Sequence, residues 1–175
     1  MIQRVVAVIG IVIVAVLLIA AGKPNVFRIQ RSIDIDAPPE KVFALIDDYH
    51  NWDKWEPRDK GSTVKKTYSA PASGKDAEME WEGSGSTGSG HMVTTESVPP
   101  RRIVVDAYWR RPFVAHNENV FTLEQEGAST KVTWTMQGTN VYMMKVMSLF
   151  MNMDRFMGQH FESGLSNLKS AAEKP

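Results

Sequence analysis

The stretch Ile33-Asp-Ile-Asp-Ala-Pro-Pro-Glu-Lys-Val-Phe43 joins the end of a predicted strand to the beginning of a predicted helix. Residues 27–36 alternate apolar and polar side chains except at Arg31, which is the period of two expected for a strand with one buried face. Pro38 and Pro39 end this strand and suit a first helical turn, where a missing N–H costs little. Helical spacing then links Val42, Phe43, Leu45, Ile46 and Tyr49.

The middle of the chain is rich in short alternating runs. Further strands are predicted at residues 63–68, 77–81, 91–98, 103–109, 119–125 and 131–136. The turns between them are short, which favours antiparallel hairpins over parallel crossovers. Residues 83–90 contain only Gly, Ser and Thr, and they predict a long flexible hairpin tip.

After Thr139 the apolar period changes to that of a helix. A single long C-terminal helix of about seven turns is predicted, because one stripe runs through the segment. The stripe consists of Met143, Met147, Phe150, Met157, Phe161, Leu165 and Leu168. A second stripe, Met144, Met147 and Met151, widens the apolar face with flexible thioethers that adapt to irregular contents.

The N-terminus carries an uninterrupted apolar run. Residues 5–21 lie between Arg4 and Lys23 without a polar side chain, and as a helix they span about 26 Å. We expect residues 1–23 to form a retained single-pass membrane anchor and residues 24–175 to form one folded domain. A cleaved secretory signal or a buried helix are the alternatives, and basic residues on both flanks leave the orientation open.

Composition excludes several classes of function. The chain has 20 basic and 20 acidic residues and no cysteine, which argues against nucleic-acid binding, disulfides and cysteine metal sites. No nucleotide-binding or hydrolase motif occurs, and the histidines lack the spacing of metal ligands. We therefore expect no cofactor and no metal. The histidines are His50, His91, His116 and His160.

Several segments carry a family resemblance. They are the stretch that ends at Phe43, Asn51-Trp-Asp-Lys-Trp55, Thr130-Lys-Val-Thr-Trp-Thr-Met136, Phe150-Met-Asn-Met-Asp154 and Gly164-Leu-Ser-Asn-Leu168. Together with the element order, they resemble the START-like helix-grip superfamily, in particular its bacterial polyketide cyclase/dehydrase-like (SRPBCC) branch, over residues 27–169. The resemblance implies an α+β helix-grip fold, in which a seven-stranded antiparallel sheet wraps around a long C-terminal helix and can enclose a cavity. It implies no transferable catalytic motif.

Strand parity predicts which side chains face such a cavity. Met79 and Trp81 point inward if the flanking glutamates face water, and Phe121 carries Asn119 and Asn117 to its own face of the sheet. The two inward amides require hydrogen-bond partners, which a ligand, the backbone or water can supply. The predicted ligand-binding residues are Met79, Trp81, Trp109, Asn117, Asn119, Phe121, Trp134, Met136, Met147 and Met151.

Three functional hypotheses follow. The first is membrane-tethered binding or transfer of a hydrophobic small molecule or lipid in the cavity, without catalysis. The second is a cyclase or dehydratase-like enzyme, in which His160 moves protons as a candidate catalytic residue. The third is a membrane-anchored interaction or stress-response module, in which Trp52, Trp55 and the tip at residues 83–90 contact an unidentified protein partner.

Overall fold

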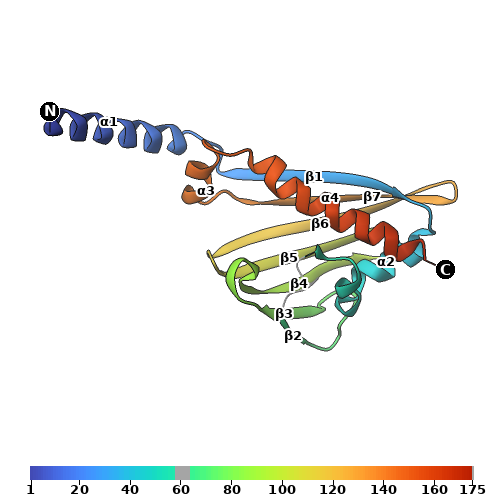
Figure 1. The fold of residues 1–175 in the computed structure, drawn as a ribbon. Helices are drawn as coiled ribbons and strands as arrows, with labels where there is room; N and C mark the ends of the chain where they lie inside the picture. Colours follow the sequence, from blue (N-terminus) through green and yellow to red (C-terminus); the bar gives the residue numbers. More distant parts are fainter. Residues whose placement is uncertain (58–63, 175) are drawn as a thin grey trace.

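A computed structural model describes residues 1–57 and 64–174 of the chain. Its centre is a seven-stranded antiparallel sheet in the order β1-β7-β6-β5-β4-β3-β2 (Figure 1). The strands are β1 (Val26–Ile35), β2 (Lys65–Tyr68), β3 (Glu78–Glu82), β4 (Ser89–Val98), β5 (Arg102–Arg111), β6 (Ala115–Glu126) and β7 (Ser129–Thr139). Each of the seven predicted strands has a counterpart here, although Thr63 lies outside the described residues.

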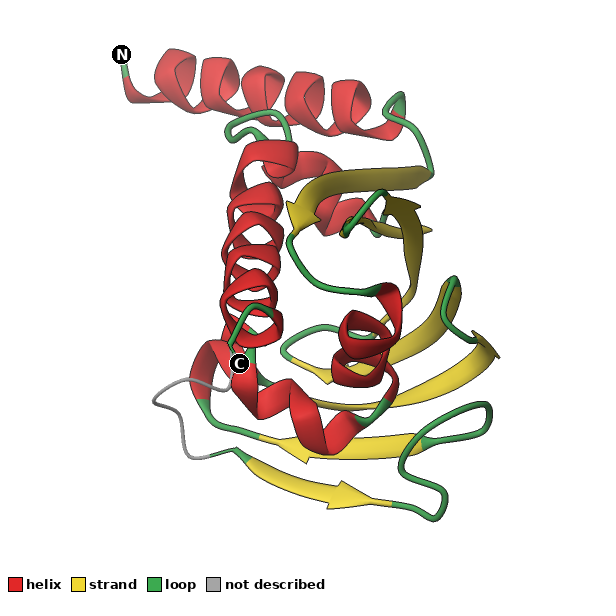
Figure 2. Cartoon of the chain, turned by 90° about the vertical axis from the view of Figure 1, so that its right-hand side faces the viewer, coloured by secondary structure: helices red, strands yellow, loops and turns green. Residues whose placement is uncertain are grey.

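The sheet curves around the last helix of the chain (Figure 2). The helices are α1 (Ile2–Ala21), α2 (Pro39–Asp47), α3 (Tyr142–Met147) and α4 (Met153–Ala172), with short 3₁₀ turns η1 (Tyr49–Lys54) and η3 (Gly85–Thr87). α4 crosses the concave face, and α2 and η1 cover the same face nearer the β2 edge (Figure 1). The predicted α+β helix-grip fold is confirmed.

The predicted single C-terminal helix is wrong in one respect, because the structure divides it into α3 and α4. Asn152 starts the second helix, since its side-chain Oδ1 accepts a hydrogen bond from the backbone N–H of Arg155 at 2.9 Å. The apolar stripe continues across the break, and periodicity alone therefore does not reveal it. Only α4 lies in the grip of the sheet, and the methionine-rich α3 lies at one end of the domain (Figure 1).

The predicted hairpin tip at residues 83–90 does join two antiparallel strands, β3 and β4. Within it, residues 85–87 form η3, and Ser89 and Gly90 begin β4, which also pairs with β5. Gly88 has a φ of 61°, and a Cβ on it would lie 2.0 Å from the carbonyl oxygen of Arg111. A Cβ on Gly90 would lie 2.2 Å from the carbonyl oxygen of Tyr108. These two glycines allow the backbone here to lie close to the backbone of β5.

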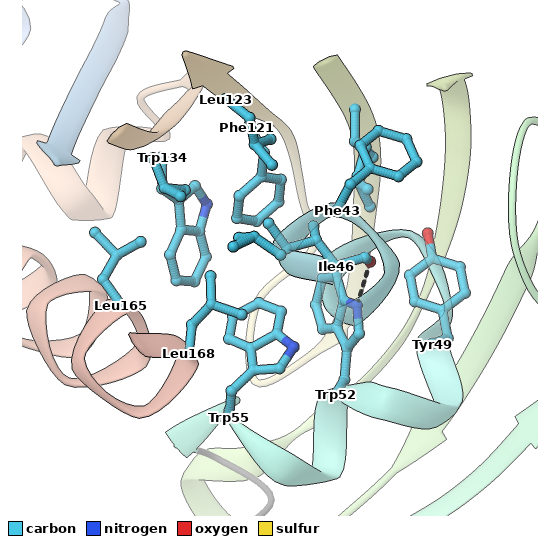
Figure 3. Packing of buried hydrophobic residues seen from close by; sticks show 14 of the residues in the cluster. Phe43, Ile46, Tyr49, Trp52, Trp55, Phe121, Leu123, Trp134, Leu165 and Leu168 are labelled. Atoms are coloured by element: carbon cyan, nitrogen blue, oxygen red, sulfur yellow. Dashed lines mark hydrogen bonds between the residues drawn. The ribbon is translucent and has the colours of Figure 1, made fainter. Parts of the chain in front are cut away.

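Trp52 and Trp55 are core residues, which corrects the hypothesis that they contact a protein partner. They are 2% and 0% exposed. Trp52 Nε1 donates a hydrogen bond to the carbonyl of Ile46 at 2.7 Å (Figure 3). Trp55 Nε1 donates one to the carbonyl of Leu45 at 2.9 Å. Both indoles thereby satisfy their only polar group on α2 and bury the rest of the ring. They hold η1 between α2 and the sheet.

Arg31, the exception in the alternation of the first strand, reaches from β1 to α4. Its Nε donates to Glu162 Oε1 at 2.8 Å, and its Nη2 donates to Asp154 Oδ2 at 3.0 Å. The hydrogen bonds to Asp154 and then to Glu162 raise the pKa of Arg31, and the hydrogen bond from Arg31 lowers the pKa of Asp154. Gly158 makes room, since a Cβ there would lie 1.9 Å from Arg31 Nη2.

α1 leaves the domain at the end where β1 begins and where α3 lies (Figure 1). It is the one helix among the described residues that is long and apolar enough to cross a membrane, and Ala20 is its only buried residue. Tyr142 Oη donates a hydrogen bond to the carbonyl of Leu17 at 2.7 Å, and Asn140 Nδ2 donates one to the carbonyl of Pro24 at 3.3 Å. α3 therefore contacts the last turns of α1.

We predict that the stabilising effect of Arg31 depends on pH. The lowered pKa of Asp154 means that this pair stabilises the fold above the unfolded-state pKa and that the effect is lost as pH falls through the folded-state value. In urea unfolding of the full chain at pH 7, Arg31→Met is expected to be less stable than Arg28→Met, an exposed control on the same strand. The difference should shrink as the pH falls below the ordinary pKa of an aspartate, about 4. A difference that stays the same on acidification would contradict the assignment.

Candidate functional site

A cavity of about 490 Å³ lies between the concave face of the sheet and α4. Its walls are mainly apolar, with aromatic rings from every side, and its only polar lining residues among those described are Asn117, Asn119, Thr139 and His160. Trp109 on β5 and Met136 on β7 line it from the sheet, and Phe161 lines it from α4. The volume lies within the usual range for sites that bind small molecules.

The cavity opens toward the end of the domain that carries α1. Phe113 and Ala115 at the β5–β6 turn, Val141 and Met144 at α3, and Phe156 at the beginning of α4 form the lining there. Phe113 and Phe156 are more than half exposed. At the other end, Trp52, Trp134 and Phe161 close the cavity with buried rings. The exposed lining residues therefore place a cavity entrance at the α1 end.

Trp134 forms the floor of the cavity. Its ring stacks on Phe161 with centroids 4.1 Å apart and planes 4° apart, and it stacks on Phe121 with centroids 5.0 Å apart. Trp55 meets it edge-on at 5.9 Å from behind (Figure 3). Because the ring is held on three sides, the floor is a rigid aromatic surface.

Two inward amides from β6 provide the polar part of the sheet wall. Asn119 Oδ1 accepts a hydrogen bond from Trp134 Nε1 at 3.1 Å. This indole is therefore one of the hydrogen-bond partners that the two inward amides were expected to require. Among the described residues, no hydrogen bond engages the side chain of Asn117 or Nδ2 of Asn119. Both residues are at least 90% buried. The cavity therefore offers amide donors and one amide oxygen to a ligand.

His160 faces the cavity from α4 and pairs with a carboxylate that the sequence did not indicate. Its Nε2 lies 3.0 Å from Oε1 of Glu56, which is 1% exposed. The two groups form an ion pair when His160 is protonated, and this contact orients the ring. Glu56 follows η1 and lies far from α4 in the sequence, so no helical spacing connects the two residues. Only the fold brings them together.

The predicted site residues fall into three groups. Trp109, Asn117, Asn119, Trp134 and Met136 line the main cavity. Met79 and Trp81 line a much smaller space of about 10 Å³ behind Met92, and Phe121 lies beneath Trp134 in the core. Met147 and Met151 lie outside both spaces, because the helix that was expected to carry them inward ends at Met147.

Sequence reasoning missed the cavity entrance and the deep wall. At the entrance, Phe113, Val141, Met144 and Phe156 line the cavity, and Met92 and Ala107 line it from the centre of the sheet. Inward parity on β4 and β5 was a usable signal for Met92 and Ala107. The helical methionine stripe was a signal for Met144, whereas Phe113 and Val141 lie in connecting segments, which have no regular period.

The remaining histidines lie away from the cavity. His91 and His116 stack on either side of Tyr108 on the outer face of the sheet, and His50 stacks on Tyr68. Within residues 1–57 and 64–174, no group of three or more metal-ligating side chains comes together.

Comparison with known families identifies the fold at the level of sequence. A family model described as "Polyketide cyclase / dehydrase and lipid transport" matches residues 26–173, from the beginning of β1 to just beyond α4. The chain belongs to the polyketide cyclase/dehydrase and lipid transport family. No curated protein matches the sequence. The family supports a hydrophobic ligand-binding or cyclase role, and its matched region contains every residue of the cavity.

Solved structures share this family fold at low sequence identity. A protein from Chromobacterium violaceum is 19% identical, with a TM-score of 0.63 over 87% of this chain and 100% of that one. The di-domain ARO/CYC protein BexL from the BE-7585A biosynthetic pathway is 13% identical, with a TM-score of 0.66 over 91% of this chain and 54% of that one. The Aha1 protein from Colwellia psychrerythraea is 20% identical, with a TM-score of 0.57 over 84% and 96% of the two chains. These similarities show the fold.

We predict that the two amides contribute differently to stability. Asn119→Leu removes the acceptor of the buried Trp134 Nε1, and the free energy of unfolding should fall by about 1–2 kcal/mol. Asn117→Leu is the matched control two residues away, and it should lose no more than about 0.5 kcal/mol because it breaks no described hydrogen bond. Urea unfolding followed by tryptophan fluorescence measures both. Equal losses in the two variants would contradict this role of Asn119.

Proposed function

We propose that the protein binds or transfers a hydrophobic small molecule or lipid in the cavity between the sheet and α4. The observation that carries this proposal is an apolar space of about 490 Å³ in a domain whose other core positions are well filled. A void of this size without a ligand forgoes dispersion contacts along its whole lining, and it is large enough for a drug-sized molecule. The membership in a family that includes lipid transport supports the same reading.

The side chains that line the cavity indicate the chemical class of the ligand. Trp109, Trp134, Met136 and Phe161 supply apolar and aromatic contacts over most of its surface. Asn117 and Asn119 offer donors and an acceptor on one wall, which suits a ligand with a carbonyl, hydroxyl or ester group at one end. No lysine or arginine lines the cavity among the described residues, and His160 faces the carboxylate of Glu56, so a neutral polar group fits better than an anionic one.

Residues 1–23 are proposed to be a single-pass membrane anchor. The support is a 20-residue apolar helix whose side chains are almost all exposed, which is unfavourable in water and favourable in lipid. Residues 24–175 then form the helix-grip domain, held next to the membrane in which apolar ligands concentrate.

Native mass spectrometry of the full chain tests this function. Protein purified gently from its own membrane is expected to carry an apolar adduct, which extraction then identifies, with denatured protein in the same detergent as the background control. Ala107→Phe puts a ring into the cavity from the centre of β5 and should reduce the adduct several-fold. Ala128→Phe, the same change in the exposed β6–β7 turn, should not. Wild-type protein without an adduct, or an adduct that survives in Ala107→Phe, would refute the proposal.

A second candidate function is proton-transfer catalysis in the same cavity. The specific observation is the pair of His160 and the buried Glu56, because a cavity histidine oriented by a carboxylate is a suitable general acid or base. The aromatic walls would hold an extended substrate in a folded conformation. This is the cyclase or dehydratase-like alternative, with His160 as the catalytic residue and Glu56 as the residue that positions it.

The mass and the fragmentation of the adduct together distinguish the two functions. If His160 transfers protons, His160→Ala should leave binding mostly intact but retain unreacted substrate, so that the adduct differs in structure from that of the wild type. If the protein only binds, the two adducts should be identical in mass and fragmentation. Asn167→Ala, on the same helix but outside the cavity lining, is the control variant. Identical adducts in all three proteins would exclude the catalytic candidate.

A further inference from the structure

Exposed apolar side chains concentrate at the cavity entrance. Val114 on the β5–β6 turn is 80% exposed, and Phe150, between α3 and α4, is 75% exposed. Their neighbours Phe113, Tyr142, Met143, Met147 and Phe156 are also exposed. Together these residues are called the entrance rim. Elsewhere in the described domain such side chains occur singly, as at Val98 on the opposite end of the sheet.

An apolar surface of this kind is unfavourable in water, and a contiguous one usually marks a binding surface. The position of α1 indicates what covers it. The hydroxyl of Tyr142, a rim residue, donates a hydrogen bond to the carbonyl of Leu17 in α1. Leu17 precedes Lys23, the first charged residue after the apolar run, by six positions, or about 9 Å along a helix. If α1 spans a bilayer, Tyr142 and the rest of α3 lie at the depth of the membrane interface.

The junction that follows α1 fixes this placement. Lys145 of α3 donates to Asn25 Oδ1 at 2.5 Å, and the backbone N–H of Asn140 donates to the carbonyl of Asn25 at 2.7 Å. The first contact ties α3, and the second ties the segment between β7 and α3, to the short link between α1 and β1. The rim therefore has little freedom to swing away from the plane in which α1 ends. Tyrosine is also the residue type that favours the interface between lipid and water.

We propose that the entrance rim inserts into the interface of the bilayer that holds α1, so that the cavity opens into lipid and is closed to water. Phe113, Met144 and Phe156 line the cavity beside the rim surface, and the same contact would thus cover the rim and connect the cavity to the membrane. The net charge of the chain is zero, and insertion therefore relies on apolar contact and needs no anionic lipid. The entry of a ligand from lipid rests on the proposed function, whereas insertion of the rim can be measured by itself.

The absence of cysteine allows the test to use single-cysteine variants of the full chain. Val114→Cys and Phe150→Cys place an environment-sensitive nitrobenzoxadiazole dye on the rim, and Ala128→Cys places it on the β6–β7 turn at the opposite end. Each protein is reconstituted into phosphatidylcholine vesicles, with or without a nitroxide on the acyl chain near the headgroup. At 114 and 150 the dye should emit at shorter wavelength, be quenched by the nitroxide lipid and be shielded from aqueous iodide. At 128 it should show the reverse.

A charge on the rim gives a second, independent readout. Phe113→Asp should reduce nitroxide quenching at position 150 several-fold although α1 still tethers the chain, whereas Val98→Asp, the matched change at the far end, should leave it unchanged. Nitroxide quenching at 114 and 150 no stronger than at 128 would overturn the proposal. Shielding from iodide without nitroxide quenching would also overturn it, because a protein partner or a second copy would then cover the rim.

The outcomes for the rim and for the cavity are separable. Quenching at the rim without an adduct in native mass spectrometry would support insertion and refute the binding function. An adduct without quenching would support the binding function and refute insertion.

Discussion

The contact between Trp134 and Phe161 sets the distance between the sheet and α4, and the cavity depends on that distance. The two rings lie face to face with centroids 4.1 Å apart. Gly164, one turn along α4 from Phe161, brings the helix close, because a Cβ there would lie 3.0 Å from Cζ3 of Trp134. Toward the α1 end no comparable pair of rings bridges the gap among the described residues, and the space remains open. The space between the sheet and α4 is therefore filled by core side chains at one end and open as the cavity at the other.

The aromatic cluster behind this contact shows why the cavity has a rigid floor. The indoles of Trp52 and Trp55 donate hydrogen bonds to carbonyls of α2. Both rings pack edge-on against Phe121, with ring centroids 6.4 and 6.2 Å apart. These rings occupy the space under α2 and η1 that would otherwise extend the cavity along the sheet (Figure 3). The close pair of His160 and Glu56 lies at the same boundary, between core and cavity.

Charge pairs hold the two ends of α4 to the first strand region. Arg31 pairs with Asp154 and Glu162 in the first half of α4, and Lys169 Nζ lies 4.0 Å from Asp36 Oδ2 near its end. The N–H of Asp36 donates to Glu173 Oε1 at 2.8 Å. The ion pairs are largely exposed, and their individual contributions are small, but together they align the helix along the edge of the sheet. Apolar contacts stabilise the packing of α4 on the sheet, and these ion pairs fix the orientation of the helix.

The sequence by itself determined the element order, the strand parity and the inward amides, because periods of two and 3.6 residues follow directly from backbone geometry. Met79, Trp81, Asn119 and Trp134 are buried on the face that parity assigned to them. Tertiary structure alone decided the break between α3 and α4, the burial of Trp52 and Trp55, and the pairing of His160 with Glu56. Each of these depends on contacts between segments distant in the chain, for which local periodicity carries no information. The same holds for the entrance rim, since turns become one surface only when the sheet curves and brings them beside the end of α1.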